Sequence, residues 1–506
     1  MAIRMTGLNS GLDTESIITQ LVSAKKTSVN SLKKAQTKLS WKVDAWKTLN
    51  SKIYSLYTGV VDKMRWDSAY NKKKSTVSNS GLLSVVAGEN VANGVQTVAV
   101  ESLAKAAYLT GGKVHTTDSS SASLNSKLTD LGAIEGSTIS FQTNGKTTDI
   151  EITSDMTVSG LVDKLKEAGV NASFDTNQQR FFVSAKSTGA ANDFTFSGDD
   201  TTLKKLGLIE DPANDHGAVK IDGSDAVMYL NGAKFESSSN TFQINGSTYT
   251  LEGVSEKNVD GTLKETTITT TDDYDEIYNT IKDFLKQYNA LINEMDKLYN
   301  ADSSKGYDPL LSEEKEALSD SEIEDWEKKI KDSLLRRDSS LSSVISSMTS
   351  TMAAGIEIGG KTLYLSSFGI NTLGYFNAEE NERHAYHIDG DADDSNTSGK
   401  TDVLKSMIAS DPTTVKNFFE KLANNLYSSM TTSMKRVEGY KSMYKVYNDK
   451  QMDKELTDYT TKIQDAEEKL NDYEDSWYSK FSKMETALAK LSSKQSALSG
   501  LLGGSQ

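Results

Sequence analysis

Cysteine is absent from this chain of 506 residues, and proline occurs only three times. The absence of cysteine excludes disulfide bonds, thiol catalysis and cysteine-ligated metal sites. No run approaches the roughly 18 apolar residues that a membrane-spanning helix needs, so we predict no membrane insertion. Hydrophobic residues make up only 36% of the chain, which favours small β-rich domains and long helices with polar faces over one large core. At about 150 residues per domain, the length indicates roughly three domains.

The charge of the chain is acidic overall but unevenly distributed. The formal net charge of −15 argues against general nucleic-acid binding. Residues 1–75 nevertheless carry 14 Lys or Arg against 5 Asp or Glu, a net charge of +9, which leaves −24 for the rest. A basic end can bind nucleic acid. Because these lysines alternate with apolar residues at helical spacing, we interpret them as a solvated helix face and predict no nucleic-acid partner.

The segment GLNSGLDTESIITQLVSAKK, residues 7–26, carries the signals of a helix start. Asp13 or Thr14 can cap the helix, and Glu15 lies in its first turn. Apolar residues then follow at helical spacing: Ile17, Ile18, Leu21 and Val22.

The early Arg4 is followed by neither a long apolar core nor a cleavage site of small residues, so we expect no cleaved secretory signal.

Two long heptad patterns lie at opposite ends of the chain. The first consists of Leu32, Leu39, Trp46, Ile53 and Val60. The second consists of Leu456, Ile463, Leu470, Trp477, Met484, Leu491 and Leu498. Such heptads predict coiled-coil helices, which are not stable alone, and a phase shift near Trp477 indicates a change of register or a break there. We expect the two ends to pair with each other, with a self-contained helical hairpin over 447–498 as the alternative.

Between the two ends the composition changes to β-branched and small polar residues. Segments such as GVQTVAVESL and STISFQT alternate as half-buried strands do. Asn-Gly pairs at 144–145, 231–232 and 245–246 predict tight hairpin turns. We also expect a short helix at VSGLVDKLKEAG and a hairpin at VNASFDTNQQRFFVSAK that presents Phe181 and Phe182. A long helix then follows, with one apolar face formed by Ile277, Ile281, Leu285, Tyr288, Ile292, Met295 and Tyr299.

These patterns predict an α+β multidomain fold, in which a discontinuous helical bundle or coiled coil from both chain ends holds two nested β-rich domains. The expected domains are a terminal helical leg (1–42 and 445–506), a helical domain with short strands (43–75 and 273–444), a β-rich domain (76–117 and 213–272) and a nested α+β domain (118–212). The glycine-rich ends, MAIRMTGLNSG and SGLLGGSQ, are expected to be mobile until they dock on another molecule.

Motifs that would support chemistry are weak. GIEIGGKT, residues 355–362, fits the letters of a phosphate-binding loop, but a Ser-rich helix precedes it and a strand-like segment follows, which reverses the required order. The stretch HAYHIDGDADD, residues 384–394, fails the EF-hand pattern, so a solvated acidic loop is favoured over a metal site. We predict no catalytic residue, no cofactor and no metal, and therefore not an enzyme. A nucleotide-using enzyme built on residues 355–362 is the weaker hypothesis.

Several stretches resemble one known family over nearly the whole chain: SGLDTESIITQLVSAKK, NASFDTNQQRFFVSAKSTG, DDYDEIYNTIKDFLKQYNALINEMDKLYN, YDPLLSEEKEALSDSEIEDWEKKIKDSLLRRDSSL and YSKFSKMETALAKLSSKQSALSGLL. The family is the bacterial flagellar filament capping protein, or hook-associated protein 2, in a version like that of Gram-positive bacteria. The resemblance implies a secreted, extracellular protein at the distal tip of the flagellum, exported without a cleaved signal.

The resemblance also implies partners. These are further copies of the chain in a ring-like homo-oligomer, most familiar as a pentamer, then flagellin, whose retention, folding and polymerisation the cap promotes, and an export chaperone before secretion. Leu12, Ile17 and Leu21 would belong to a leg that docks on the filament. The two heptad rows would hold that leg together as coiled-coil assembly residues. The alternative is an extracellular adhesin whose β-domains bind host glycan or mucin.

Overall fold

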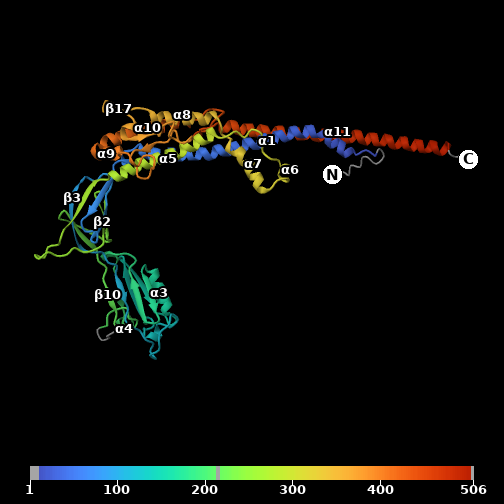
Figure 1. Ribbon diagram of the computed structural model, residues 1–506. Helices are drawn as coiled ribbons and strands as arrows, with labels where there is room; N and C mark the ends of the chain where they lie inside the picture. Colours follow the sequence, from blue (N-terminus) through green and yellow to red (C-terminus); the bar gives the residue numbers. More distant parts are fainter. Residues whose placement is uncertain (1–10, 212–216, 503–506) are drawn as a thin grey trace. The chain divides into compact units, whose positions relative to one another are not determined.

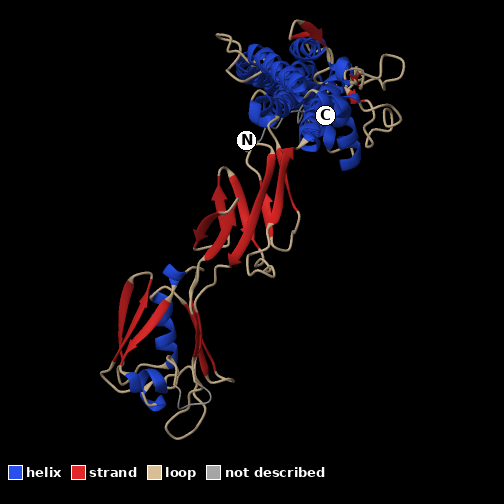
Figure 2. Cartoon of the chain, turned by 90° about the vertical axis from the view of Figure 1, so that its left-hand side faces the viewer, coloured by secondary structure: helices blue, strands red, loops and turns tan. Residues whose placement is uncertain are grey.

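The computed structural model describes residues 11–211 and 217–502, and within it the chain forms two compact units (Figure 1). The first unit combines residues 1–70 with 274–506, and the second is residues 71–273. Figure 2 shows that helices dominate the first unit and strands the second. The predicted fold class, an α+β protein with β-rich domains inserted into a discontinuous helical frame, is confirmed.

The first unit is mainly helical. Its helices are α1 (Thr14–Leu56), α2 (Asp62–Met64), α5 (Tyr274–Asn300), α6 (Ser312–Lys315), α7 (Asp320–Asp332), α8 (Ser339–Ala353), α9 (Val403–Ser410), α10 (Pro412–Ser433) and α11 (Asp449–Leu502). Its short strands pair antiparallel, β16 (Ile356–Ile358) with β17 (Lys361–Leu363) and β18 (Ile370–Asn371) with β19 (His387–Ile388). A π-helical turn, Tyr57–Val61, joins α1 to α2.

Helix α1 begins where its capping residue predicts. The Asp13 carboxylate accepts a hydrogen bond from the backbone N–H of Ser16 at 3.0 Å, which satisfies a donor that the helix leaves free. No proline or glycine interrupts the helix until Gly59, whose non-helical backbone lies in the π-helical turn. The predicted long N-terminal helix is therefore confirmed.

Helix α11 is continuous over its 54 residues. The predicted break near Trp477 is wrong, because Tyr473, Trp477 and Phe481 lie one turn apart with ring centroids about 6.1 Å from each other. The alternative of a helical hairpin over 447–498 is wrong for the same reason. Residues 499–502, which we expected to belong to a mobile end, continue the helix. The rest of the ends predicted to be mobile, 1–10 and 503–506, lies outside the described residues.

One apolar core holds the first unit together. The second half of α1 packs there with α5, α8, α9 and α10, and the largest fully buried side chains include Trp46, Tyr288, Phe368, Phe418 and Phe419. The apolar face predicted for α5 is confirmed: Ile277, Ile281, Leu285, Tyr288, Ile292 and Met295 are buried and Tyr299 is partly buried. Burial of these faces, at about 25 cal/mol per Å² of apolar surface, stabilises the helical frame.

The second unit contains two separate cores. The outer core lies between a five-stranded antiparallel sheet, in the order β1-β15-β3-β11-β12, and a three-stranded sheet, β13-β14-β2. These strands are β1 (Lys73–Val77), β2 (Leu83–Val86), β3 (Gly94–Ser102), β11 (Ala226–Leu230), β12 (Ala233–Ser237), β13 (Thr241–Ile244), β14 (Ser247–Leu251) and β15 (Thr266–Asp272). Leu83, Val98, Val100 and Met228 are fully buried in it.

The inner core lies between two further sheets, β10-β4-β8-β7 and β6-β5-β9, and two helices. These elements are β4 (Tyr108–Thr110), β5 (Thr138–Thr143), β6 (Lys146–Glu151), α3 (Val158–Glu167), β7 (Asn171–Asp175), β8 (Arg180–Ser184), β9 (Phe194–Gly198), α4 (Asp200–Lys205) and β10 (Val219–Ile221).

The inner domain is longer at both ends than the predicted range of 118–212. Strands β4 and β10 pair with each other, and β4 pairs with β8, so the boundaries lie between Ala104 and Ala107 and between Ala218 and Ala226. The predicted presentation of Phe181 is also wrong, because Phe181 is fully buried. Phe182 is partly buried.

All three Asn-Gly pairs form the predicted turns. Asn144 and Gly145 join β5 to β6, with φ of 49° and 70°. Asn231 and Gly232 join β11 to β12 in the same way, as do Asn245 and Gly246 between β13 and β14. Positive φ at both central residues is what a tight antiparallel hairpin requires, and Asn-Gly adopts it at low cost.

Candidate assembly surface

Helices α1 and α11 pack side by side and run antiparallel (Figure 1). Gln36 Nε2 donates to Thr460 Oγ1 at 2.8 Å, and Lys33 Nζ lies 2.6 Å from Glu467 Oε1. Further along, Lys25 Nζ lies 5.6 Å from the centre of the Tyr473 ring. Residue numbers fall on α1 as they rise on α11, so the two ends of the chain support each other.

The predicted assembly residues occupy a gradient of burial along this pair. On α1 and the following turn, Trp46, Ile53 and Val60 are buried, while Leu32 and Leu39 are half-buried. On α11, Ile463 is buried, while Leu456, Leu470, Trp477 and Met484 are half-buried. Leu491 and Leu498 are 65% and 61% exposed. The helix pair is therefore buried where it joins the core of the first unit, and its apolar side chains become exposed toward the C-terminal end of α11.

The residues expected to dock on a filament lie at this uncovered end. Leu12 and Leu21 are 48% and 37% exposed, and Ile17 is half-buried. Their neighbours Ile18 and Val22 are buried. The register of α1 against α11 places Thr14 about level with Met484, so α11 continues past the start of α1 with its apolar residues open to solvent.

The lysines of α1 make ion pairs with four other parts of the first unit, α5, α6, the start of α8 and α11. They are Lys26 with Glu313 (3.0 Å), Lys34 with Glu314 (2.7 Å), Lys42 with Asp338 (2.8 Å), Lys52 with Glu294 (2.7 Å) and, as above, Lys33 with Glu467. The backbone N–H of Leu311, and then Lys34, lower the pKa of Glu314. Each such exposed pair contributes about 0–1 kcal/mol. The lysines of these pairs are 23–51% exposed, which agrees with the predicted solvated face, and the structure adds their acidic partners.

A buried asparagine, which sequence reasoning missed, fixes the loop that leads into α11. Asn50 is 4% exposed; its Nδ2 donates to the Tyr444 carbonyl at 3.2 Å, and its Oδ1 accepts from the Val446 N–H at 2.9 Å. Trp46 stacks on Tyr447 with ring centroids 5.2 Å apart. The sequence does show a polar residue at a position where the helical spacing predicts a buried one. It could not show the partners of Asn50, because they lie almost 400 positions away.

Replacement of Asn50 by alanine is expected to destabilise the first unit by about 1–3 kcal/mol, because the partly buried Tyr444 carbonyl and the buried Val446 N–H would lose their partner. Thermal and urea unfolding of the full chain would measure this change. Asn30→Ala on the same helix is the matched control, since the Asn30 side chain makes no hydrogen bond among the described residues. Equal stability of the two variants would contradict the role given to Asn50.

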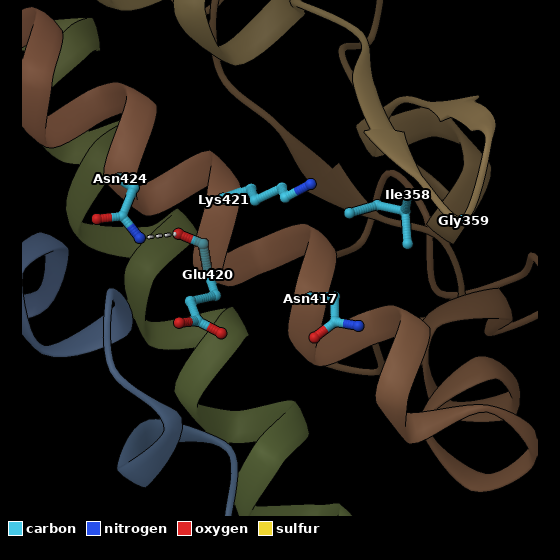
Figure 3. Close-up of a pocket in the computed structure, with 6 residues that line it drawn as sticks. All are labelled: Ile358, Gly359, Asn417, Glu420, Lys421 and Asn424. Atoms are coloured by element: carbon cyan, nitrogen blue, oxygen red, sulfur yellow. Dashed lines mark hydrogen bonds between the residues drawn. The ribbon is translucent and has the colours of Figure 1, made fainter.

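The GIEIGGKT segment folds as the β16–β17 hairpin, so the hypothesis of a nucleotide-binding loop is wrong. Figure 3 shows the adjoining pocket of about 370 Å³, lined by Ile358, Gly359, Asn417, Glu420, Lys421 and Asn424. The Lys421 ammonium donates to the Glu357 carbonyl at 3.0 Å. A strand, and not the N-terminus of a helix, follows the two glycines, and the Glu420 carboxylate would repel phosphate.

Two lysines and a histidine hold the acidic loop after β19, which corrects the expectation of a solvated loop. Its pairs are Asp389 with Lys400 (2.8 Å), Asp391 and Asp393 with Lys282 (2.6 and 2.7 Å) and Asp394 with His387 (2.6 Å). Nearby, His384 Nδ1 lies 2.7 Å from the buried Asp296 carboxylate. Within residues 11–211 and 217–502, no cluster of three or more metal-ligating side chains is found.

The pair of His384 and Asp296 makes stability depend on pH. The hydrogen bond to Asp296 raises the pKa of His384 above its ordinary 6.5, so the stabilisation is complete below about pH 6.5 and is lost as pH rises through the raised pKa. His384→Asn should therefore lower the melting temperature near about pH 5.5 and change it little near about pH 8.5. His115→Asn, at an exposed histidine of the second unit, is the control. An equal effect of His384→Asn at both pH values would contradict this pairing.

Comparison with known proteins identifies the family. The profile described as flagellar hook-associated protein 2 N-terminus matches residues 10–107, and that described as flagellar hook-associated protein 2 C-terminus matches residues 223–493, more than half of the chain. This chain belongs to the flagellar hook-associated protein 2 family. The resemblance noted in the sequence is confirmed, and with it the prediction that the chain is not an enzyme, because this family is structural. Residues 108–222, between the two matches, coincide with the inner core, Ala107 to Ala218.

Individual relatives within the hook-associated protein 2 family are distant in sequence. Flagellar hook-associated protein 2 of Halalkalibacterium halodurans is 22% identical over 98% of this chain and 99% of its own length. The protein of that name from Escherichia coli K12 is 28% identical over 47% of this chain and 51% of its own. A crystal structure of the D1-D2-D3 domains of the Escherichia coli flagellar cap protein FliD has a TM-score of 0.48 at 21% identity, covering 77% of this chain and 97% of that one. No helix in the described part of this chain has an apolar stretch long enough to cross a membrane.

Proposed function

We propose that this protein forms the cap at the distal end of the flagellar filament, where it retains exported flagellin and promotes its folding and polymerisation. Membership of the hook-associated protein 2 family carries this proposal. The relatives and solved structures to which the chain is similar bear the names hook-associated protein 2 and flagellar cap protein. The protein acts outside the cell, after export without a cleaved signal and with an export chaperone as its partner inside.

The pair of α1 and α11 serves as the leg that docks on the filament, and its heptad rows act as a coiled coil. Leu12, Leu21, Leu491 and Leu498 are large apolar side chains that are each 37–65% exposed. Exposed apolar surface of this kind marks a binding site for another molecule. A helical terminal segment of flagellin fits it, because an amphipathic helix buries its apolar stripe against such a surface. The caps assemble as rings, with five copies as the expected number.

Deletion of the gene tests the proposal by following where flagellin goes. A cap predicts flagellin shed into the medium as monomer and cells that carry hooks without filaments. Complementation with the full chain should restore filaments. Filaments of normal length in the deletion strain would refute a cap. Among the described residues of the second unit, no feature favours the alternative of an adhesin over this function.

A further inference from the structure

An aromatic knob projects from the loop between β18 and β19. Phe376 is 95% exposed and Tyr375 is 65% exposed, although a buried position would stabilise a side chain like Phe376 by about 1.5–3 kcal/mol. The loop is ordered locally: Gly374 has φ of +79°, its carbonyl accepts the backbone N–H of Ala378 at 3.0 Å, and the Arg383 guanidinium lies 4.0 Å from the centre of the Tyr375 ring. Tyr375 and Phe376, which we call the knob, are therefore presented outward on a defined support.

A second aromatic surface is formed by the loop between α10 and α11 together with Tyr54 of α1. Tyr54, Val437, Tyr440, Met443 and Tyr444, which we call the tyrosine patch, are each 37–54% exposed. Tyr54 and Tyr444 contact edge to face, with ring centroids 5.5 Å apart. Tyr444 holds a left-handed backbone conformation, φ +63°, which costs about 1–3 kcal/mol in a residue other than glycine. The hydrogen bond from Asn50 to its carbonyl supports this conformation.

The two surfaces carry opposite charge. Residues 435–445 around the tyrosine patch contain four basic residues and one acidic residue, a net charge of +3, whereas residues 375–383 of the knob loop contain three glutamates and one arginine, a net charge of −2. Among the described residues, Lys435 and Lys445 form no salt bridge, and neither do Glu379, Glu380 and Glu382. Charges that rim an apolar contact and lack partners within their own chain favour a complementary surface on another molecule.

Both surfaces lie at the same height along the helical unit. The knob loop is anchored on α5 by the contact of His384 with Asp296, and the tyrosine patch is anchored on α1 through Asn50. Lys52 and Glu294 join α1 to α5 at this level, 2.7 Å apart. When one patch of each copy binds a different patch of the next copy at the same height, the copies form a closed ring if the rotation from one copy to the next divides a full turn. If each copy were also shifted along the axis of assembly, the copies would form a helix instead.

We propose that the knob of one copy of this chain inserts into the tyrosine patch of the next copy, and that this head-to-tail contact joins the subunits of the ring. The inference rests on the proposed function, because it names the surface through which the cap assembles. Phe376 is the buried anchor of the contact. Glu379 and Glu380 face Lys435 and Lys445 at its rim.

The absence of cysteine from the chain allows a clean cross-linking test on the full-length protein. Phe376→Cys and Met443→Cys are prepared as two separate single variants and treated with a short bismaleimide, each alone and mixed. A head-to-tail contact predicts a covalent dimer in the mixture and none in either variant alone. The variant that carries both substitutions should give a ladder whose highest band counts the subunits. Tyr364→Cys, at another tyrosine of the first unit that is 47% exposed, replaces Phe376→Cys as the control and should give no dimer with Met443→Cys.

Two results would overturn the proposed contact. One is a dimer in either single variant alone, which means a symmetric contact of like with like. The other is no dimer in the mixture. Light scattering of the same samples separates the causes: oligomers without cross-links refute the contact but leave the cap proposal in place, whereas monomers at all concentrations count against both. In the second case, loss of flagellin binding in Phe376→Ser would identify flagellin as the occupant of the knob.

A second measurement uses affinity. Phe376→Ser should weaken self-association about 30-fold, as expected for an aromatic anchor, without changing the melting temperature, because Phe376 is exposed in the single chain. Glu379→Lys with Glu380→Lys should weaken it too, and mixing that variant with Lys435→Glu, Lys445→Glu should restore hetero-association. Sedimentation equilibrium that finds no change for Phe376→Ser would refute the knob.

Discussion

Truncation of the chain after Ala487 is expected to abolish filament growth completely while leaving the stability of both units within about 0.5 kcal/mol of the full chain. In α11, Leu491 and Leu498 are 65% and 61% exposed, and residues 488–499 contribute to none of the cores. Most of the described residues among them are exposed, so we expect their removal to cost little tertiary packing. It removes the uncovered end of the leg, which the proposed function requires for docking on the filament.

The truncation is tested in the deletion strain by electron microscopy of filaments, by swimming in soft agar and by calorimetry of the purified protein. A double substitution, Leu491→Ser with Leu498→Ser, should reproduce the loss of filaments. Ser492→Ala with Ser493→Ala, on exposed positions of the same turn, should not. Normal filaments from the truncated chain would contradict a docking role for this end, and a lower melting temperature would show that it belongs to the folded frame.

Replacement of Trp46 by alanine is expected to destabilise the first unit by about 3–5 kcal/mol, the range for removal of a buried aromatic side chain. Trp46 is 1% exposed, stacks on Tyr447 and lies where α1 meets the loop that leads into α11. Its removal therefore leaves a cavity and weakens the root of the helix pair at the same time. The melting temperature of the first unit should fall by about 5–8 °C.

Calorimetry is the suitable measurement for Trp46→Ala, because a chain with two units need not unfold in one step. Only the transition of the first unit should move, since Trp46 belongs to its core. Trp66→Ala is the matched control: this side chain is 58% exposed, so its loss should change stability by less than about 1 kcal/mol. Equal shifts for the two tryptophans would mean that burial of Trp46 does not govern the stability of the unit.

The sequence was a good guide wherever a feature depends on neighbouring residues. The cap at Asp13, the uninterrupted course of α1 and the apolar face of α5 follow from helical spacing over a few turns. The three Asn-Gly turns follow from the backbone preferences of two residues. It was a poor guide to domain boundaries. The prediction placed β4 and β10 in the outer domain, but β4 pairs with both β10 and β8, and β8 belongs to the inner core.

The sequence by itself determined the two long terminal helices, the hairpins between them, the lack of catalytic motifs and, through its resemblance, the flagellar family. Only the tertiary structure decided that Asn50 fixes the entry to α11, that the lysines of α1 contact carboxylates, and that the knob and the tyrosine patch lie at one height with opposite charge. The physical reason is range. Helices and turns are set by interactions over a few residues, whereas the contacts of Asn50 with Tyr444 and of Gln36 with Thr460 join residues 394 and 424 positions apart, and only the folded core brings such residues together.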